Sequence, residues 1–137
     1  MDQPFRILAL HHNSILRDGI SILIETHEGL HLVGSVAEPG PAVLLFEKER
    51  PDLTLIDLDL PADTGLGALH QIKAMDAEAV IIGLVTYDWS ESVSRAMELG
   101  ATAVLAKDLL GELLIPFIQA ARLRTAMLHV FEERSTP

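Results

Sequence analysis

The chain of 137 residues has 20 acidic and 10 basic residues and a formal net charge of -10. This charge disfavours direct binding to nucleic acid and to anionic membranes. The absence of cysteine excludes disulfides and thiolate metal sites. No stretch reaches the roughly 18 apolar residues of a membrane span, and the N-terminus lacks a signal-peptide pattern. We therefore expect a cytoplasmic chain with one folded domain.

Short apolar runs bounded by turn residues alternate with runs of helical periodicity along the chain. The apolar runs predict strands at Phe5–Leu10, His31–Ala37, Leu53–Ile56 leading into Asp57, Val80–Val85 and Thr102–Ala106. Helices are expected from Ser14 as N-cap, over Ala42–Arg50 after a break at Pro39-Gly40-Pro41, after a loop at Ala62–Gly67, over Asp88–Leu99, and from about Gly111. Five alternations of strand and helix indicate an α/β fold, with a parallel sheet covered by helices on both faces.

Pro116 lies within the last expected helix. Because proline lacks an N–H and clashes with the preceding turn, we expect it to kink this helix or to delay its start to about Ile115. Residues 1–123 are expected to form the domain, and residues 124–137 a helical extension with a linker or tail. We interpret the extension either as a dimer surface or as a linker to an effector domain.

Asp57 follows a short apolar run in the segment P-D-L-T-L-I-D-L-D-L-P, which extends from Pro51 to Pro61. Such a run is typical of a central strand that is buried on both faces. Asp57 should then stand at the carboxyl edge of the sheet, where ligands gather in open α/β folds. Lys107 ends the fifth strand, and a lysine there needs a counter-charge. We expect Asp57 to supply it.

Further motifs accompany Asp57: L-R-D-G-I at 16–20, a glycine at 65, M-E-L-G-A-T-A at 97–103 and K-D at 107–108. Their order and spacing, from about Phe5 to Arg122, resemble the receiver domain of bacterial two-component response regulators, in the branch that precedes a LuxR-type helix-turn-helix. The resemblance implies a flavodoxin-like (βα)5 doubly wound sheet with strand order 2-1-3-4-5. It also implies a histidine kinase, an effector domain or protein partner, and a homodimer through strand 5 and the last two helices.

In the family pattern a phosphoryl group is transferred to the aspartate at the position of Asp57. Mg²⁺ is held there by an acidic pair after strand 1, by the acceptor, and by the backbone carbonyl of the residue at the position of Asp59. The acidic pair falls here on His11 and His12. Since Mg²⁺ prefers oxygen ligands, we expect the magnesium site to be lost.

Three other hallmark positions of the family fall after strand 4 and on or after strand 5. The hydroxyl that binds the phosphoryl group corresponds to Val85, with Thr86 one residue later. The aromatic switch position is Val104, and the conserved lysine of the family pattern is Lys107. Of the hallmark positions, only Asp57 and Lys107 clearly keep the family's residue types.

These departures favour a receiver-like signalling module that regulates transcription by protein-protein contact, with Mg²⁺-dependent phosphorylation impaired or absent. Asp57 would then be an anion held by Lys107, the chain would not be an enzyme, and no cofactor would be needed. The alternative is a phospho-accepting receiver that uses Asp57, in which case Mg²⁺ is required and the only catalysis is self-phosphorylation of the aspartate from a kinase donor.

A second alternative is a metal or small-molecule sensor that uses His11, His12 and Asp57. Two imidazoles and a carboxylate suit Zn²⁺ or another late transition metal. Against this, adjacent histidines at the end of a strand are expected to point in different directions. Asp59 is expected to be a solvated loop residue, with an inward turn toward the site as the other option.

Overall fold

The protein is described here by a computed structural model that covers residues 3–86 and 91–135, with side chains up to residue 128. Five parallel strands form one sheet in the order β2-β1-β3-β4-β5. The strands are β1 (Phe5–Leu10), β2 (Leu30–Val36), β3 (Leu53–Asp57), β4 (Ile81–Val85) and β5 (Ala103–Ala106). The predicted doubly wound α/β architecture and its strand order are confirmed.

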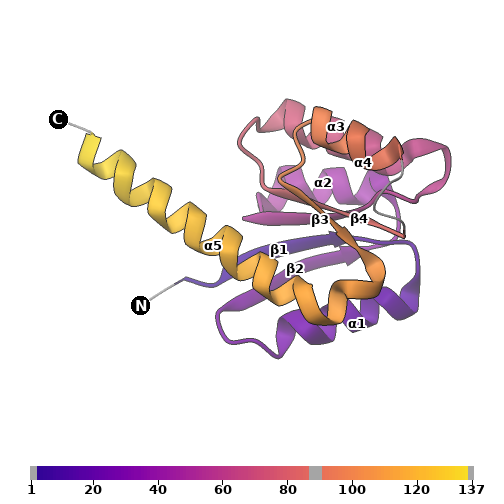
Figure 1. Ribbon diagram of the computed structural model, residues 1–137, viewed down its shortest axis with the longest axis horizontal. Coiled ribbons are helices and arrows are strands. Elements are labelled where there is room, and N and C mark those ends of the chain that lie inside the picture. The colour runs from indigo at the N-terminus through magenta and orange to yellow at the C-terminus, as the bar shows by residue number, and fades with distance from the viewer. Residues whose placement is uncertain (1–2, 87–90, 136–137) are drawn as a thin grey trace.

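Helices cover both faces of the sheet (Figure 1). They are α1 (Ser14–Glu25), α2 (Pro39–Glu49), α3 (Thr64–Met75), α4 (Glu91–Glu98) and α5 (Leu110–Ser135), with short 3-10 turns η1 (Pro61–Asp63) and η2 (Lys107–Leu109). One apolar cluster joins the sheet to α2, α3 and α4. A second cluster joins it to α1 and α5. The sheet is thus buried between two helical layers, which is why β3 is buried along its whole length.

Two helices begin at residues other than those predicted. The N-cap of α1 is Asn13, not Ser14, because the Asn13 side chain accepts the amides of Ile15 and Leu16. Helix α2 begins at Pro39, so the predicted break at Pro39-Gly40-Pro41 is wrong. Proline suits the first turn of a helix, since its fixed φ is helical and its missing N–H would have no partner there.

Helix α3 begins at Thr64, inside the segment predicted to be a loop. Helix α5 begins at Leu110 and continues through Pro116, so the predicted delay to Ile115 is wrong. Proline removes one hydrogen bond near the start of the helix, while Leu114 is fully buried and anchors the same turn in the core. The last helix runs without interruption across the expected boundary at 123 and projects beyond the sheet (Figure 1).

The helix predicted over Asp88–Leu99 is described from Glu91 to Glu98, and its predicted first residues lie outside the described part of the chain. The extension predicted at 124–137 is helical as far as Ser135, and residues 136–137 lie outside the described part of the chain. Within the described ranges, no helix is long and apolar enough to cross a membrane.

Candidate functional site

The carboxyl ends of the central strands bring distant polar residues to one edge of the sheet. His11 follows β1, Asp57 ends β3, Thr86 follows β4 and Lys107 follows β5. Parallel strands make this convergence unavoidable, because all their carboxyl ends lie on the same side. Residues separated by up to 96 positions, from His11 to Lys107, therefore form one site.

Asp57 is fully buried, and groups on both sides hold its two carboxylate oxygens. Its Oδ1 lies 2.8 Å from Lys107 Nζ and accepts the backbone amide of Asp59 at 2.9 Å. Its Oδ2 lies 2.8 Å from His12 Nδ1 and 3.6 Å from His11 Nε2. The pairing of Lys107 with Asp57 that the sequence predicts is present.

The two histidines face the same carboxylate oxygen, so the expectation that they point apart is wrong. Their rings are parallel, with an interplanar angle of 3° and centroids 5.6 Å apart. The His11 side chain is 2% exposed and that of His12 is 53% exposed. Since β1 ends before His11, the chain no longer follows the alternation of a strand, and both side chains turn toward Asp57.

The hydrogen-bond partners of each imidazole ring determine which of its nitrogens carries the proton. Ionised Asp57 can only accept, so His12 Nδ1 carries the proton in the 2.8 Å hydrogen bond. The amide of Asn13 donates to His11 Nδ1 at 3.1 Å. A neutral His11 therefore carries its proton on Nε2, the atom that faces Asp57.

Asp59 lies in the exposed turn after β3, as predicted for a loop residue, and its side chain also turns toward the site, which is the other predicted option. Its Oδ2 lies 2.9 Å from Lys107 Nζ. The same oxygen accepts the Thr86 amide at 2.9 Å and the Thr86 hydroxyl at 2.7 Å. Lys107 consequently bridges two carboxylates, and Asp59 connects the loop after β3 with the loop after β4.

The other two hallmark positions carry no polar group. Val85 ends β4 and is fully buried. The Thr86 hydroxyl lies in the site, but it donates to Asp59 rather than facing Asp57. Val104 lies beside Gly83 of β4 and packs against the apolar cluster under α3 and α4. The predicted switch position is therefore filled by a short, partly buried apolar side chain.

The charges in the site stabilise one another. Burial raises the pKa of Asp57, but hydrogen bonds from Lys107 and His12 outweigh it and hold that pKa below its ordinary value. The pKa of Asp59 is likewise low, because Lys107 and Thr86 overcome the effect of burial. Burial lowers the pKa of Lys107, whereas the two carboxylates raise it above its ordinary value. Both aspartates and the lysine are thus charged at neutral pH.

Histidine 11 differs from these charged groups. Burial holds its pKa below the ordinary value, and the nearby cation Lys107 acts in the same direction, while Asp57 opposes both. His11 is therefore neutral at pH 7. The site contains a buried neutral imidazole where the family pattern has a carboxylate.

Three residues that position the site were not assigned a role from the sequence. The Arg17 guanidinium donates to the carbonyls of His11 and His12, at 2.9 and 3.3 Å. Asn13 caps α1 and orients His11. Gly65 brings the start of α3 against the Asp57 backbone, and a Cβ there would overlap the Asp57 carbonyl oxygen. Arg17 and Gly65 belong to the motifs that carry the family resemblance. Membership in those motifs was the sequence feature that could have pointed to their role in the site.

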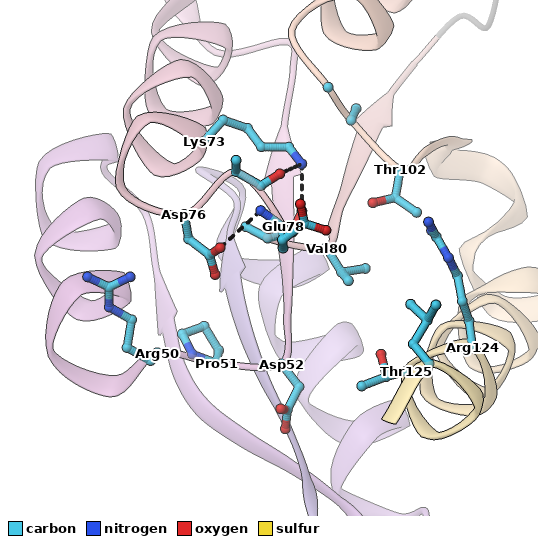
Figure 2. A pocket seen from close by; sticks show the side chains of 15 residues that line it. Arg50, Pro51, Asp52, Lys73, Asp76, Glu78, Val80, Thr102, Arg124 and Thr125 are labelled. Carbon is cyan, nitrogen blue, oxygen red and sulfur yellow. Dashed lines mark hydrogen bonds between the residues drawn. The ribbon is translucent and has the colours of Figure 1, made fainter. Parts of the chain in front are cut away.

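A separate hollow of about 680 Å³ lies at the opposite edge of the sheet. Figure 2 shows its lining, which includes Asp52, Val80 and Thr102, the residues just before β3, β4 and β5. Lys73 in this lining donates to the carbonyls of Ala77 and Ala79. Acidic and basic side chains are mixed there, so the hollow favours no ligand charge. The edge that carries Asp57 is the candidate functional site.

The fold and the site define a class: a doubly wound α/β domain with an aspartate and a lysine at the carboxyl edge of its sheet. The family described as "Response regulator receiver domain" matches residues 7–119. The chain therefore belongs to the response-regulator receiver domain family, and the resemblance noted from the sequence motifs is confirmed.

The relatives include a transcriptional regulatory protein and an enzyme. The transcriptional regulatory protein YdfI of Bacillus subtilis is 34% identical over 116 residues, which cover 85% of this chain and 54% of YdfI. A protein-glutamate methylesterase/protein-glutamine glutaminase of Anaeromyxobacter dehalogenans is 28% identical over 124 residues, which cover 89% of this chain and 33% of that protein. The chain thus spans about half or less of the length of these relatives.

A solved structure supports the same assignment. A two-component response regulator of the LuxR family from Aurantimonas superposes with a TM-score of 0.74 at 26% identity. The match covers 86% of this chain and 87% of that one. The chain is a receiver domain of a response regulator, related to transcriptional regulators; receiver domains are signalling modules and generally not enzymes.

Proposed function

We propose that this domain signals by protein-protein contact and that Mg²⁺-dependent phosphorylation of Asp57 is impaired or absent. The observation that carries the proposal is the state of the Asp57 carboxylate. Lys107 and the Asp59 amide occupy Oδ1, and His12 occupies Oδ2, with His11 beside it. A carboxylate held on both oxygens has to break these contacts before it can attack a phosphoryl donor.

The donor set does not fit Mg²⁺. The ion requires near-octahedral oxygen ligands, whereas the positions of the acidic pair present imidazole nitrogens. Asp59 does not replace the lost acids, because its inward oxygen is bound by Lys107 and Thr86. The residues present therefore do not provide the oxygen ligands that the family pattern uses to bind Mg²⁺.

The switch elements are also altered. The hydroxyl that would follow a phosphoryl group is missing at Val85, and the Thr86 hydroxyl is bound to Asp59. Val104 is too short to move between the core and the surface as an aromatic side chain can. These features support a domain that is fixed in one state, with its outer surface available to partners.

The partners we propose follow from the relatives. YdfI is a transcriptional regulatory protein about twice the length of the match, so an effector domain or a separate regulator is the proposed target. The net charge of -10 supports the view that this domain does not itself contact nucleic acid. A homodimer through β5 and the last two helices is proposed as the second kind of contact.

Acetyl phosphate with Mg²⁺, followed by intact-mass measurement, tests the proposal. We expect no phosphoryl adduct on the wild-type chain under conditions that modify a receiver with an intact acidic pair, run in parallel. Incubation with a cognate histidine kinase should give the same result. An adduct that disappears in the D57N variant would contradict the proposal.

That outcome would support the second candidate function, a phospho-accepting receiver. The specific observation in its favour is that Asp57 and Lys107 keep the family's residue types and lie 2.8 Å apart. The histidines would then have to move away from Oδ2 during phosphorylation.

A further inference from the structure

Three potential metal-binding atoms converge at the carboxyl edge of the sheet. One nitrogen of His11, one of His12 and a carboxylate oxygen of Asp57 all lie within 4.8 Å of one another. The contacts identify these atoms as His11 Nε2, His12 Nδ1 and Asp57 Oδ2. Two of the three residues are almost completely buried, so this is not a cluster of surface charges.

His11 Nε2 is the second, independent observation. It is buried and has no hydrogen-bond partner among the residues that the structure describes. The atom faces Asp57 Oδ2, but 3.6 Å is too long for a hydrogen bond. A buried polar atom without a partner carries a cost of about 1 to 3 kcal/mol. Such an atom aimed into a group of ligand atoms points to a ligand that would satisfy it.

We propose that His11 Nε2, His12 Nδ1 and Asp57 Oδ2 bind one late first-row transition metal ion, of which Zn²⁺ is the best fit. Two imidazoles and one carboxylate form a ligand set that Zn²⁺ accepts and Mg²⁺ does not favour. Solvent or a small molecule supplies the fourth ligand through the exposed side of His12. The inference builds on the proposed function, since it gives the altered acidic site a different metal.

The contacts of Asp57 are compatible with this metal. Lys107 and the Asp59 amide hold Oδ1, so Oδ2 can turn from His12 to the ion without releasing the lysine. The carboxylates of Asp57 and Asp59 together offset the charge of Lys107 and part of the charge of the ion. These outer contacts orient the ligand as the supporting residues of metal sites do.

Metal binding would also change the loop between β1 and α1. For a neutral imidazole to bind the ion, His12 carries its proton on Nε2 instead of Nδ1, and His11 moves its own proton from Nε2 to Nδ1. The Asn13 amide, which donates to His11 Nδ1 at 3.1 Å, must then turn away. Because Asn13 is also the N-cap of α1, binding of the ion would change the conformation of the first turn of that helix.

Titration of the untagged full chain with Co²⁺ and with Zn²⁺ tests the site. We expect visible Co²⁺ absorption bands that saturate at one ion per chain and are displaced by Zn²⁺. The H12Q variant should weaken binding by at least about 100-fold, since even supporting residues of metal sites contribute 10- to 100-fold. The H70Q variant, which changes an exposed histidine of α3, is the matched control and should bind as wild type.

Amide spectra with Zn²⁺ should show changes at Asn13 and the first turn of α1. Absence of Co²⁺ bands in the wild type, or equal binding by H12Q, would overturn the inference. His12 is half exposed, so H12Q should fold, which its amide spectrum verifies. Phosphorylation by acetyl phosphate and Mg²⁺ is a separate measurement, so a failed metal site and a failed proposed function give different results.

Discussion

At the scale of single residues, Lys107 holds the site together. Its ammonium group lies within 2.9 Å of both Asp57 and Asp59, and its side chain is 16% exposed. Asp57 is fully buried, and the buried His11 beside it is neutral at pH 7. Removing the lysine would leave a buried carboxylate without its main counter-charge.

The K107M variant should therefore be strongly destabilised. Breaking a buried ion pair by removing one partner costs about 3 kcal/mol or more, and denaturant unfolding measures this loss. The K48M variant changes an exposed lysine at the end of α2 and should stay within about 0.5 kcal/mol of wild type. Equal stability of the two variants would show that Lys107 does not sustain the buried charge.

The buried His11 makes stability depend on pH in the mildly acidic range. Its pKa is lower in the folded chain than in the unfolded chain, so the unfolded chain binds more protons. The stability that this group contributes is complete above the ordinary histidine pKa of about 6.5 and is lost as the pH falls below it. The slope can reach about 1.4 kcal/mol per pH unit for one proton.

Urea unfolding between neutral and mildly acidic pH, with a chelator present, measures this effect. The H11Q variant should show a shallower dependence, because glutamine does not titrate. If wild type and H11Q lose stability in parallel, His11 is not the responsible group. The exposed His70 supplies a control through H70Q, which should keep the wild-type slope.

The sequence predicts the identities of these residues better than their orientations. Asp57 and Lys107 could be paired because strand ends converge in a parallel sheet. The directions of His11, His12 and Asp59 could not be predicted, since they depend on loop dihedral angles that no periodicity encodes. The Asn13 cap and the Arg17 contacts fix those loops, and both involve backbone groups that the sequence does not show.

At the scale of elements, the approach of α3 to β3 fixes the position of Asp57. Gly65 lies against the Asp57 backbone so closely that any side chain would overlap a carbonyl oxygen. Neither chain segment can yield easily, because β3 is a central strand and α3 is packed in the core. The glycine is needed for space rather than for an unusual backbone angle.

The G65A variant should lose about 3 kcal/mol or more, because overpacking against backbone cannot be relieved by a rotamer change. Gly67 offers a matched control in the same helix, since no described residue lies within 4 Å of a Cβ built there. G67A should gain up to about 1 kcal/mol from helix propensity. Thermal and denaturant unfolding of both variants measures whether the free energy of unfolding falls in G65A and rises in G67A. Similar effects of the two substitutions would contradict the close approach.

The order and type of the elements were predictable, but several boundaries were not. Apolar runs and helical periodicity identify each strand and helix. Pro39 and Pro116 both misled the prediction, but for different reasons. Pro39 lies in the first turn of α2, where proline costs no hydrogen bond, whereas Pro116 lies inside α5, which continues in spite of the hydrogen bond lost there. Tertiary contacts, such as the burial of Leu114, decide where such a helix begins.

At the scale of the whole molecule, the receiver fold is complete, while the residues around Asp57 differ from those that the family pattern predicts. Both apolar layers and the strand order are intact. The departures that the resemblance predicts lie at or near the edge where Asp57 is found: imidazoles at the positions of the acidic pair, and valines at those of the hydroxyl and the aromatic residue. His11 and His12 are therefore the residues that we propose separate this chain from receivers that depend on Mg²⁺.

A Mg²⁺ titration of the isotope-labelled chain, followed by amide spectra, tests that claim most directly. Wild type should show no saturable change around Asp57 at millimolar Mg²⁺. The double variant H11D/H12D, which restores the acidic pair, should show one. A saturable response of the wild-type site, centred on Asp57 and equal to that of the double variant, would contradict the account.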